Sequence, residues 1–230
     1  MLKLILIKIG AIRTARLQGF APRYIVGLNV LVGMTQAIST KHAGMVDIGP
    51  SGRAMAEAMN PELQDAFQDH LNMERQAHAA YFAAAIWFAE RELRGFARFF
   101  RDESNNEHQH AAKFSDYLIA RGQSVALHAV TPPLQSWASP AEVMATAFLM
   151  EADLTASLQQ LYAMAERNGD TRSTVFLDPM VDQQTQSEHE FAHLLGRVRF
   201  ADNQASALLL IDNELDQGNN KPASLQSDPA

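Results

Sequence analysis

The sequence predicts an all-α protein, built as a four-helix bundle with one long crossover loop and a short fifth helix near the C-terminus. Apolar residues recur at alternating steps of three and four along four segments, which is the spacing of one face of a packed helix. The second and third segments are separated by a long loop that contains Pro132 and Pro133. Clusters of β-branched residues, which would favour strands, are scarce. These observations favour two helical hairpins packed against each other.

The first hairpin should begin at Asn60-Pro61, because Asn is a good N-cap and Pro is favoured at the first helical position. Its first apolar stripe consists of Phe67, Leu71, Glu74, His78, Tyr81, Ala85 and Phe88. Its second stripe consists of Leu93, Phe96, Phe100, Glu103, Glu107, His110, Phe114 and Tyr117. The connection from Glu90 to Gly95 is short, so the two helices should be antiparallel neighbours.

The second hairpin should begin after the loop from Gly122 to Pro140, at the helix start Ser139-Pro140. Its stripes are Met144, Ala147, Glu151, Leu154, Leu158, Leu161, Ala165 and then Leu177, Val181, Gln184, Ser187 or Glu188, Phe191, Leu195, Val198. Pro179 should kink the last helix. Helices of this size are ~42 Å long at 1.5 Å per residue, a length that the loop can cross at ~3.3 Å per residue. The fifth helix is expected from Ala205 to Leu215.

Charge and composition divide the chain into three parts: an N-terminal extension (1–50), the bundle (51–217) and a polar tail (218–230). Residues 1–44 hold six of the 19 basic residues and none of the 26 acidic ones, so the remainder carries 13 − 26 = −13. The extension is either disordered, a targeting segment, or a mis-assigned start with translation beginning at Met45. The acidic body argues against nucleic acid and favours cations. No apolar run is long enough for a membrane span.

Glu74, Glu107, His110 and Glu151 fall on the apolar stripes near the middles of their helices. Burying several carboxylates together is tolerable if they bind metal. Glu107 and His110 form Glu-x-x-His, which places both side chains on one helix face. The separation of 33 residues from Glu74 to Glu107 recurs from Glu151 to Gln184. Since the chain has no cysteine and the ligands are mainly oxygens, iron or manganese is favoured. Gln184 in place of a second Glu makes the two metal positions unequal.

Each of these residues also has a plainer interpretation. Glu-x-x-His arises often by chance, and Glu74 could be a polar residue that sets helix register. Tyr81, two turns after Glu74, could hydrogen-bond a ligand carboxylate, supply an electron or simply pack. His78 is interpreted as a core or interface histidine. The second motif, Glu190-x-x-His193, comes six residues too late for the 33-residue spacing and is interpreted as surface or interface, and the role of Glu188 stays open.

Several segments resemble the ferritins, especially bacterial non-haem ferritins of the cyanobacterial kind, over roughly residues 50–220. They are Asn72-Met-Glu-Arg through Tyr81, Glu107-His-Gln-His110, Phe148-Leu-Met-Glu151-Ala-Asp, Phe176-Leu-Asp-Pro and Leu210-Ile-Asp-Asn-Glu-Leu215. The resemblance implies a cytoplasmic 24-subunit shell that stores ferric mineral. It also implies a ferroxidase centre with two irons per subunit, which oxidises Fe(II) with O2. Its residues would be Glu74, Glu107, His110 and Glu151, with Tyr81 and Gln184 nearby.

Differences from the family narrow this expectation. The positions of a third iron site correspond to Asn106, Gln183 and Ser187, none of which is a carboxylate, and this argues against a third site. The second Glu-x-x-His of bacterioferritins is absent at the required place, so no haem is expected. By the same resemblance, Asp178 is placed in an acidic entry channel, and Glu103, one turn before Glu107, would pass iron onward. The alternatives are a di-iron oxidase or peroxidase, and a purely structural bundle. The structural bundle is disfavoured because no Lys or Arg falls on the four stripes.

Overall fold

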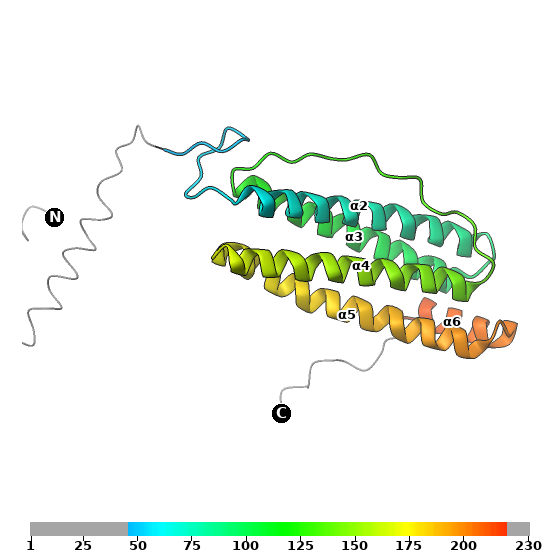
Figure 1. Ribbon diagram of the computed structural model, residues 1–230. Coiled ribbons are helices and arrows are strands. Elements are labelled where there is room, and N and C mark those ends of the chain that lie inside the picture. The colour runs from blue at the N-terminus through cyan, green and yellow to red at the C-terminus, as the bar shows by residue number, and fades with distance from the viewer. Residues whose placement is uncertain (1–45, 220–230) are drawn as a thin grey trace, which may run out of the picture. The chain divides into compact units, whose positions relative to one another are not determined.

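The computed structural model describes residues 46–219, so the predicted N-terminal extension and polar tail lie almost entirely outside the described residues. Within that range the chain forms five helices and a single isolated β-bridge, between Ile48 and Ala54. The helices are α2 (Pro61–Ala89), α3 (Arg94–Ala120), α4 (Pro140–Arg167), α5 (Thr171–Ala201) and α6 (Ala205–Asp216). Figure 1 shows α2 to α5 side by side in one bundle. The predicted all-α bundle with a short fifth helix is confirmed.

The two hairpins are α2 with α3 and α4 with α5, and α6 folds back mainly against α3. Side chains cap the starts of three helices: Asn60 accepts from the amide of Leu63, Ser139 from that of Glu142, and Asp170 from that of Ser173, each at 3.2 Å. Helix α5, the last helix of the bundle, begins at Thr171 and continues through Pro179 as one element. None of the helices in the described range has an apolar run suited to crossing a lipid bilayer.

The core has two apolar halves. One half is built around Phe88, Phe96 and Phe100, whose rings stack at centroid distances of 4.7 Å (Phe88–Phe96) and 5.5 Å (Phe88–Phe100). The other half is built around Phe67 and Phe114, whose ring centroids are 5.7 Å apart. Along α2 and α3, the buried Glu74, Glu107 and His110 lie between the residues of these two halves. The bundle therefore encloses a polar layer between two apolar layers.

The crossover between the hairpins, residues 121–139, runs along α2, as Figure 1 shows. Three side-chain amides on one face of α2 hold it by bonding its backbone. Gln68 accepts from the amide of Ala126 at 2.8 Å, Asn72 from that of His128 at 2.9 Å, and Gln76 from that of Thr131 at 2.8 Å. The Gln68 and Gln76 amides also donate to the carbonyls of the same loop residues. Side chains thus satisfy loop backbone groups that have no sheet partner.

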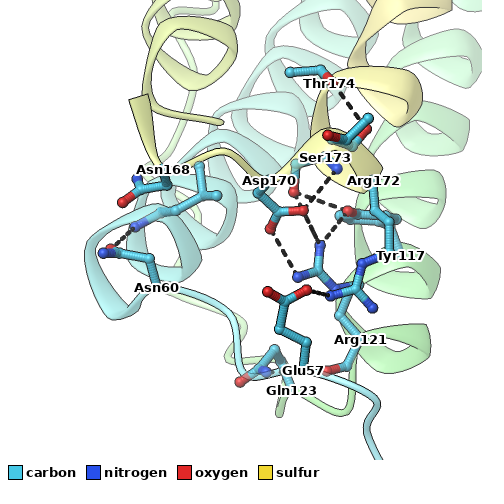
Figure 2. Close-up of polar contacts among 12 residues, drawn as sticks. Glu57, Asn60, Tyr117, Arg121, Gln123, Asn168, Asp170, Arg172, Ser173 and Thr174 are labelled. Carbon is cyan, nitrogen blue, oxygen red and sulfur yellow. Dashed lines mark hydrogen bonds and ion pairs between the residues drawn. The ribbon is translucent and has the colours of Figure 1, made fainter. Parts of the chain in front are cut away.

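A polar cluster joins the ends of the two hairpins (Figure 2). The Arg121 guanidinium, at the end of α3, donates to both carboxylate oxygens of Asp170, at 3.0 and 2.8 Å, and to the Tyr117 hydroxyl at 2.7 Å. Asp170 is also the N-cap of α5, so one carboxylate orders a helix start and links α3 to α5. The exposed pair of Arg172 and Glu57, at 2.7 Å, lies beside it in the same view.

The segment before α2 packs against the start of the crossover. The Ser51 amide and hydroxyl both donate to the carbonyl of Gly122, at 3.2 and 2.9 Å. A Cβ at Gly49 would lie 2.2 Å from that carbonyl oxygen, so this close approach requires glycine. Within the described range, residues 47–219 therefore belong to one compact unit with the bundle.

Candidate metal centre

Two helices bring three metal-ligating side chains together in the polar layer. Glu74 comes from α2, and Glu107 and His110 come from α3; all three are buried, and their ligand atoms lie within 4.8 Å of one another. The Nδ1 atom of His110 is 3.0 Å from Oε2 of Glu107 and 3.8 Å from Oε2 of Glu74. The structure thus places this part of the predicted ligand set in one cluster.

The Oε2 atom of Glu74 is fully buried and accepts no hydrogen bond from any described residue. A buried carboxylate oxygen without a donor is costly unless a cation compensates it. Because this oxygen faces His110 and lies in the cluster with Glu107, the arrangement suits an ion held between the three side chains. Oxygen donors with one imidazole are the ligands that iron and manganese accept readily.

Glu151, the fourth predicted ligand, accepts hydrogen bonds from two neighbouring side chains. Its Oε1 accepts a 2.5 Å hydrogen bond from the Tyr81 hydroxyl, and its Oε2 accepts one of 2.8 Å from the Gln184 side chain. Tyr81 and Gln184 therefore both touch the predicted site, and each occupies one oxygen of the same carboxylate. Glu151 does not belong to the three-residue cluster in this arrangement.

The protonation of the cluster follows from burial and mutual contact. Burial raises the pKa of Glu107 to about 9, and the nearby Glu74 adds to the rise. Burial favours the neutral ring of His110, but hydrogen bonding to Glu107 and the proximity of Glu74 outweigh it and raise its pKa to about 10. Burial also opposes ionisation of Glu74, yet His110 and His70 outweigh it and lower its pKa well below the usual value. Contact with the two histidines therefore favours the ionised form of Glu74, although its Oε2 has no hydrogen-bond donor among the described residues.

Sequence reasoning missed His70, which lies one turn before Glu74 on α2. Its Nε2 is 3.1 Å from Oε1 of Glu74, and its Nδ1 is 2.9 Å from the Ser157 hydroxyl of α4. The side chain is 1% exposed. The i, i+4 spacing to Glu74 was the available signal, but His70 flanks the apolar stripe instead of lying on it. By contrast, His78 is half-buried and bonds Ser104 of α3, which suits its interpretation as a helix-interface histidine.

The two predicted entry residues differ in their surroundings. Glu103 is half-buried, and burial followed by the charges of Glu190 and Glu151 raises its pKa to about 8. It lines a cavity of about 450 Å³ together with Glu190 and Asp182. Asp178 is exposed and accepts a 2.9 Å hydrogen bond from the Tyr162 hydroxyl. It is not among the residues that line that cavity, although its neighbour Pro179 is.

The remaining polar candidates lie at the edge of this region. Asn106, Gln183 and Ser187 line the same cavity as Glu103, and Lys113 donates to the Gln183 side chain at 3.3 Å. His193 lines a separate groove between α5 and α6. The described residues place no further group of three metal-ligating side chains together.

Comparisons with known proteins agree with this architecture. A ferritin-like domain profile matches residues 64–201. The bacterial non-heme ferritin of Staphylococcus saprophyticus is 27% identical over 157 residues, which cover 68% of this chain and 94% of that protein. The bacterial non-heme ferritin of Staphylococcus aureus (strain USA300) is 28% identical over 158 residues, covering 68% and 95%.

Solved structures show the same likeness. The open pore ferritin from the hyperthermophilic archaeon Archaeoglobus fulgidus superposes with a TM-score of 0.67 at 27% identity, covering 69% of this chain and 98% of that one. A humanized archaeal ferritin gives a TM-score of 0.67 at 25% identity, covering 69% and 96%. The resemblance to bacterial non-haem ferritins that the sequence motifs indicated is confirmed. Since the ferritin-like profile spans residues 64–201 of the 230 in the chain, the protein belongs to the ferritin family.

Proposed function

We propose that this chain is a ferroxidase subunit. It binds Fe(II) in the polar layer, transfers electrons from Fe(II) to O2, and delivers the ferric iron into a hollow homo-oligomer. The observation that carries this proposal is the buried Oε2 of Glu74, which has no hydrogen-bond donor among the described residues and lies beside His110 and Glu107. A cation supplies what that oxygen lacks, and the ion that ferritins store is iron. Two Fe(II) ions bound in one site supply two electrons together, which suits reduction of O2.

Each side chain has a distinct role in this proposal. Glu74 and His110 hold the first iron, and Glu107 lies between the two metal positions as a bridge. Glu151 takes the second iron after giving up part of its bonding to Tyr81 or Gln184. Because the first position is already assembled and the second is not, we expect the two irons to bind with unequal strength. Unequal binding suits turnover of iron as substrate instead of a permanent cofactor.

The route of iron to the site forms a further part of the proposal. A dication does not cross an apolar bundle unaided, because desolvating it is costly. Asp178 supplies an acidic group at the surface of α5, and the half-buried Glu103 lies one turn before Glu107 on α3. Copies of Asp178 around a shell axis would concentrate negative potential and attract Fe(II). We propose that this chain assembles into the 24-subunit shell that its resemblance to the ferritins implies.

The decisive experiment is stopped-flow oxidation of Fe(II), at two Fe(II) per subunit, followed in the near-ultraviolet. The parent should show a fast phase, and Glu107→Ala should lose it while remaining folded, because removing one buried acid relieves repulsion in the cluster. Asp116→Ala, an exposed position on the same helix, is the control and should retain the fast phase. If Glu107→Ala oxidises iron as fast as the parent, the site is wrong.

The size of the purified protein separates the proposal from its alternative. An iron-loaded particle far larger than one 25.4 kDa subunit supports a storage shell. A monomer or dimer that consumes O2 or peroxide together with an organic substrate would support a di-iron oxidase or peroxidase instead. Analytical ultracentrifugation with iron quantification distinguishes the two.

A further inference from the structure

His70 is fixed on three sides in the interior of the bundle. Its Nε2 lies 3.1 Å from Oε1 of Glu74, its Nδ1 lies 2.9 Å from the Ser157 hydroxyl, and its ring centroid is 4.5 Å from that of Phe114. Three helices contribute these partners, since Glu74 belongs to α2, Phe114 to α3 and Ser157 to α4. A side chain held in this way has little freedom to rotate.

The hydrogen bonds assign the ring nitrogens. An ionised carboxylate only accepts hydrogen bonds, so Nε2 of His70 carries the proton and donates to Glu74. In the neutral ring, Nδ1 then accepts from the Ser157 hydroxyl, which fixes this tautomer. Ser157 therefore acts on Glu74 through His70, although the two residues make no hydrogen bond with each other among the bonds of the described chain.

The bond from His70 makes the two oxygens of Glu74 unequal. Oε1 is occupied by His70, whereas Oε2 has no donor among the described residues and lies 3.8 Å from Nδ1 of His110. We infer that His70, anchored by Ser157, is a positioning residue that holds Glu74 so that one oxygen alone faces the metal ion. This inference rests on the proposed function, because it takes Glu74 as a ligand of iron.

The expected consequence is a change in both affinity and coordination. Without His70, the Glu74 carboxylate can turn to bind through both oxygens or move away from the ion. Loss of such outer partners of metal ligands weakens metal affinity by roughly 10- to 100-fold in other proteins. A residue that only fills space would instead lower thermal stability without changing the geometry around the ion.

Co(II) tests this inference because its visible absorption reports coordination geometry and it does not require O2. We would titrate Co(II) into the anaerobic apoprotein and compare His70→Phe, His70→Gln and Ser157→Ala with the parent. His70→Phe keeps a flat ring beside Phe114 and removes the donor; it should bind Co(II) roughly 10- to 100-fold more weakly, with a shifted spectrum. His70→Gln restores a donor and should recover most of the affinity, and Ser157→Ala should lie between them.

A second histidine of α2 provides a matched control. His78 is one turn after Glu74, as His70 is one turn before it, and it bonds a serine of a neighbouring helix, Ser104, at 2.9 Å. It contacts α3 and makes no bond to Glu74 among those of the described residues. His78→Phe should therefore leave the Co(II) affinity and spectrum unchanged, even if it lowers the melting temperature.

The outcomes are separable from those of the proposed function. Parent-like Co(II) binding and spectrum in His70→Phe overturn the inference, and so does an equal loss in His78→Phe. If the parent does not bind Co(II), or if Glu107→Ala binds it as well as the parent does, both the inference and the proposed site are overturned. If Co(II) binding behaves as expected but the parent does not oxidise Fe(II), the positioning role stands and the ferroxidase function fails.

Discussion

The Tyr81 side chain has two roles, hydrogen bonding through its hydroxyl and packing through its ring, and removing the hydroxyl oxygen separates them. Its hydroxyl bonds Glu151, while its ring packs against Phe191 and Phe100 at centroid distances of 5.4 and 5.9 Å. Burial, followed by the charge of Glu151, raises the pKa of the phenol well above its usual value, so the hydroxyl stays protonated in the resting site. A phenol that is hydrogen-bonded to a carboxylate can give an electron to the reacting site while its proton passes to that carboxylate.

We therefore predict that Tyr81→Phe keeps the packing and slows the fast phase of Fe(II) oxidation. A lost hydrogen bond to a charged group is worth about 1.5 kcal/mol, which corresponds to roughly tenfold in rate. Stopped-flow absorbance measures the rate, and electron paramagnetic resonance of freeze-quenched parent protein detects a tyrosyl radical. An unchanged rate, with no radical in the parent, would leave only the packing role.

The acidic route predicts a different kinetic signature. Asp178→Ala and Glu103→Ala should slow the initial oxidation of Fe(II), because they remove charges that attract and relay the ion. The number of Fe(II) ions bound per subunit at equilibrium should stay the same, since neither residue belongs to the three-residue cluster. Variants that keep the parental rate and instead lose thermal stability or assembly would assign both residues structural roles.

At the scale of the helices, the Arg121–Asp170 pair connects the hairpins at the end of the bundle away from the Phe88 half of the core. Burial tends to raise the pKa of Asp170, but its hydrogen bonds with Arg121 and the Ser173 amide outweigh it, and the pKa is lowered. A group with a lowered pKa in the folded state stabilises the fold above its unfolded pKa, near 3.9 for Asp. That stabilisation is lost as the pH falls through the lowered pKa.

We predict that Asp170→Asn, which keeps a capping residue, lowers the free energy of unfolding by about 2 kcal/mol at neutral pH. The difference from the parent should shrink as the pH falls below 4 and vanish in stronger acid. Urea denaturation at several pH values measures it. Glu57→Gln is the control, because it breaks the exposed pair with Arg172 and should change stability by less than about 1 kcal/mol. A pH-independent loss in Asp170→Asn would contradict the ion-pair explanation.

The sequence predicted some helix ends better than others, for local reasons. Asn60-Pro61 and Ser139-Pro140 are confirmed as starts of α2 and α4, because a cap residue followed by proline is a local signal. Asp170 caps α5 through the Ser173 amide, but no proline follows it, and the start of α5 was not predicted. The bonds of Gln68, Asn72 and Gln76 to the crossover were not predictable, since exposed amides on a helix normally bond water.

The same distinction applies to the metal centre. Glu74, Glu107 and His110 were predicted because polar residues on an apolar stripe conflict with its pattern, and the structure brings these three together. His70 causes no such conflict, because it lies beside the stripe, and its contacts with Phe114 and Ser157 depend on how the helices pack. Ser157 gives no sequence signal at all, and its contact with His70 depends on how the two hairpins pack.

For the molecule as a whole, the compact unit that contains the bundle begins at Asp47. We predict that a chain starting at Met45 folds, assembles into the same large particle and oxidises Fe(II) at the parental rate, because it retains the contacts of Gly49 and Ser51 with Gly122. Size-exclusion chromatography with light scattering, followed by stopped-flow kinetics, measures both properties. Failure to assemble would mean that residues 1–44 contribute to the particle.

The crossover sets two different repeats side by side on the face of α2. Four helical residues advance ~6 Å, whereas two residues of extended chain advance ~6.6 Å. The bonded positions of α2 are 68, 72 and 76, but those of the loop are 126, 128 and 131. The loop therefore has one more residue between His128 and Thr131 than between Ala126 and His128. The spacing of the bonded loop residues is thus matched to the spacing of the bonded residues of α2. Adding or deleting a single residue between His128 and Thr131 would move the Thr131 amide out of reach of the Gln76 side chain.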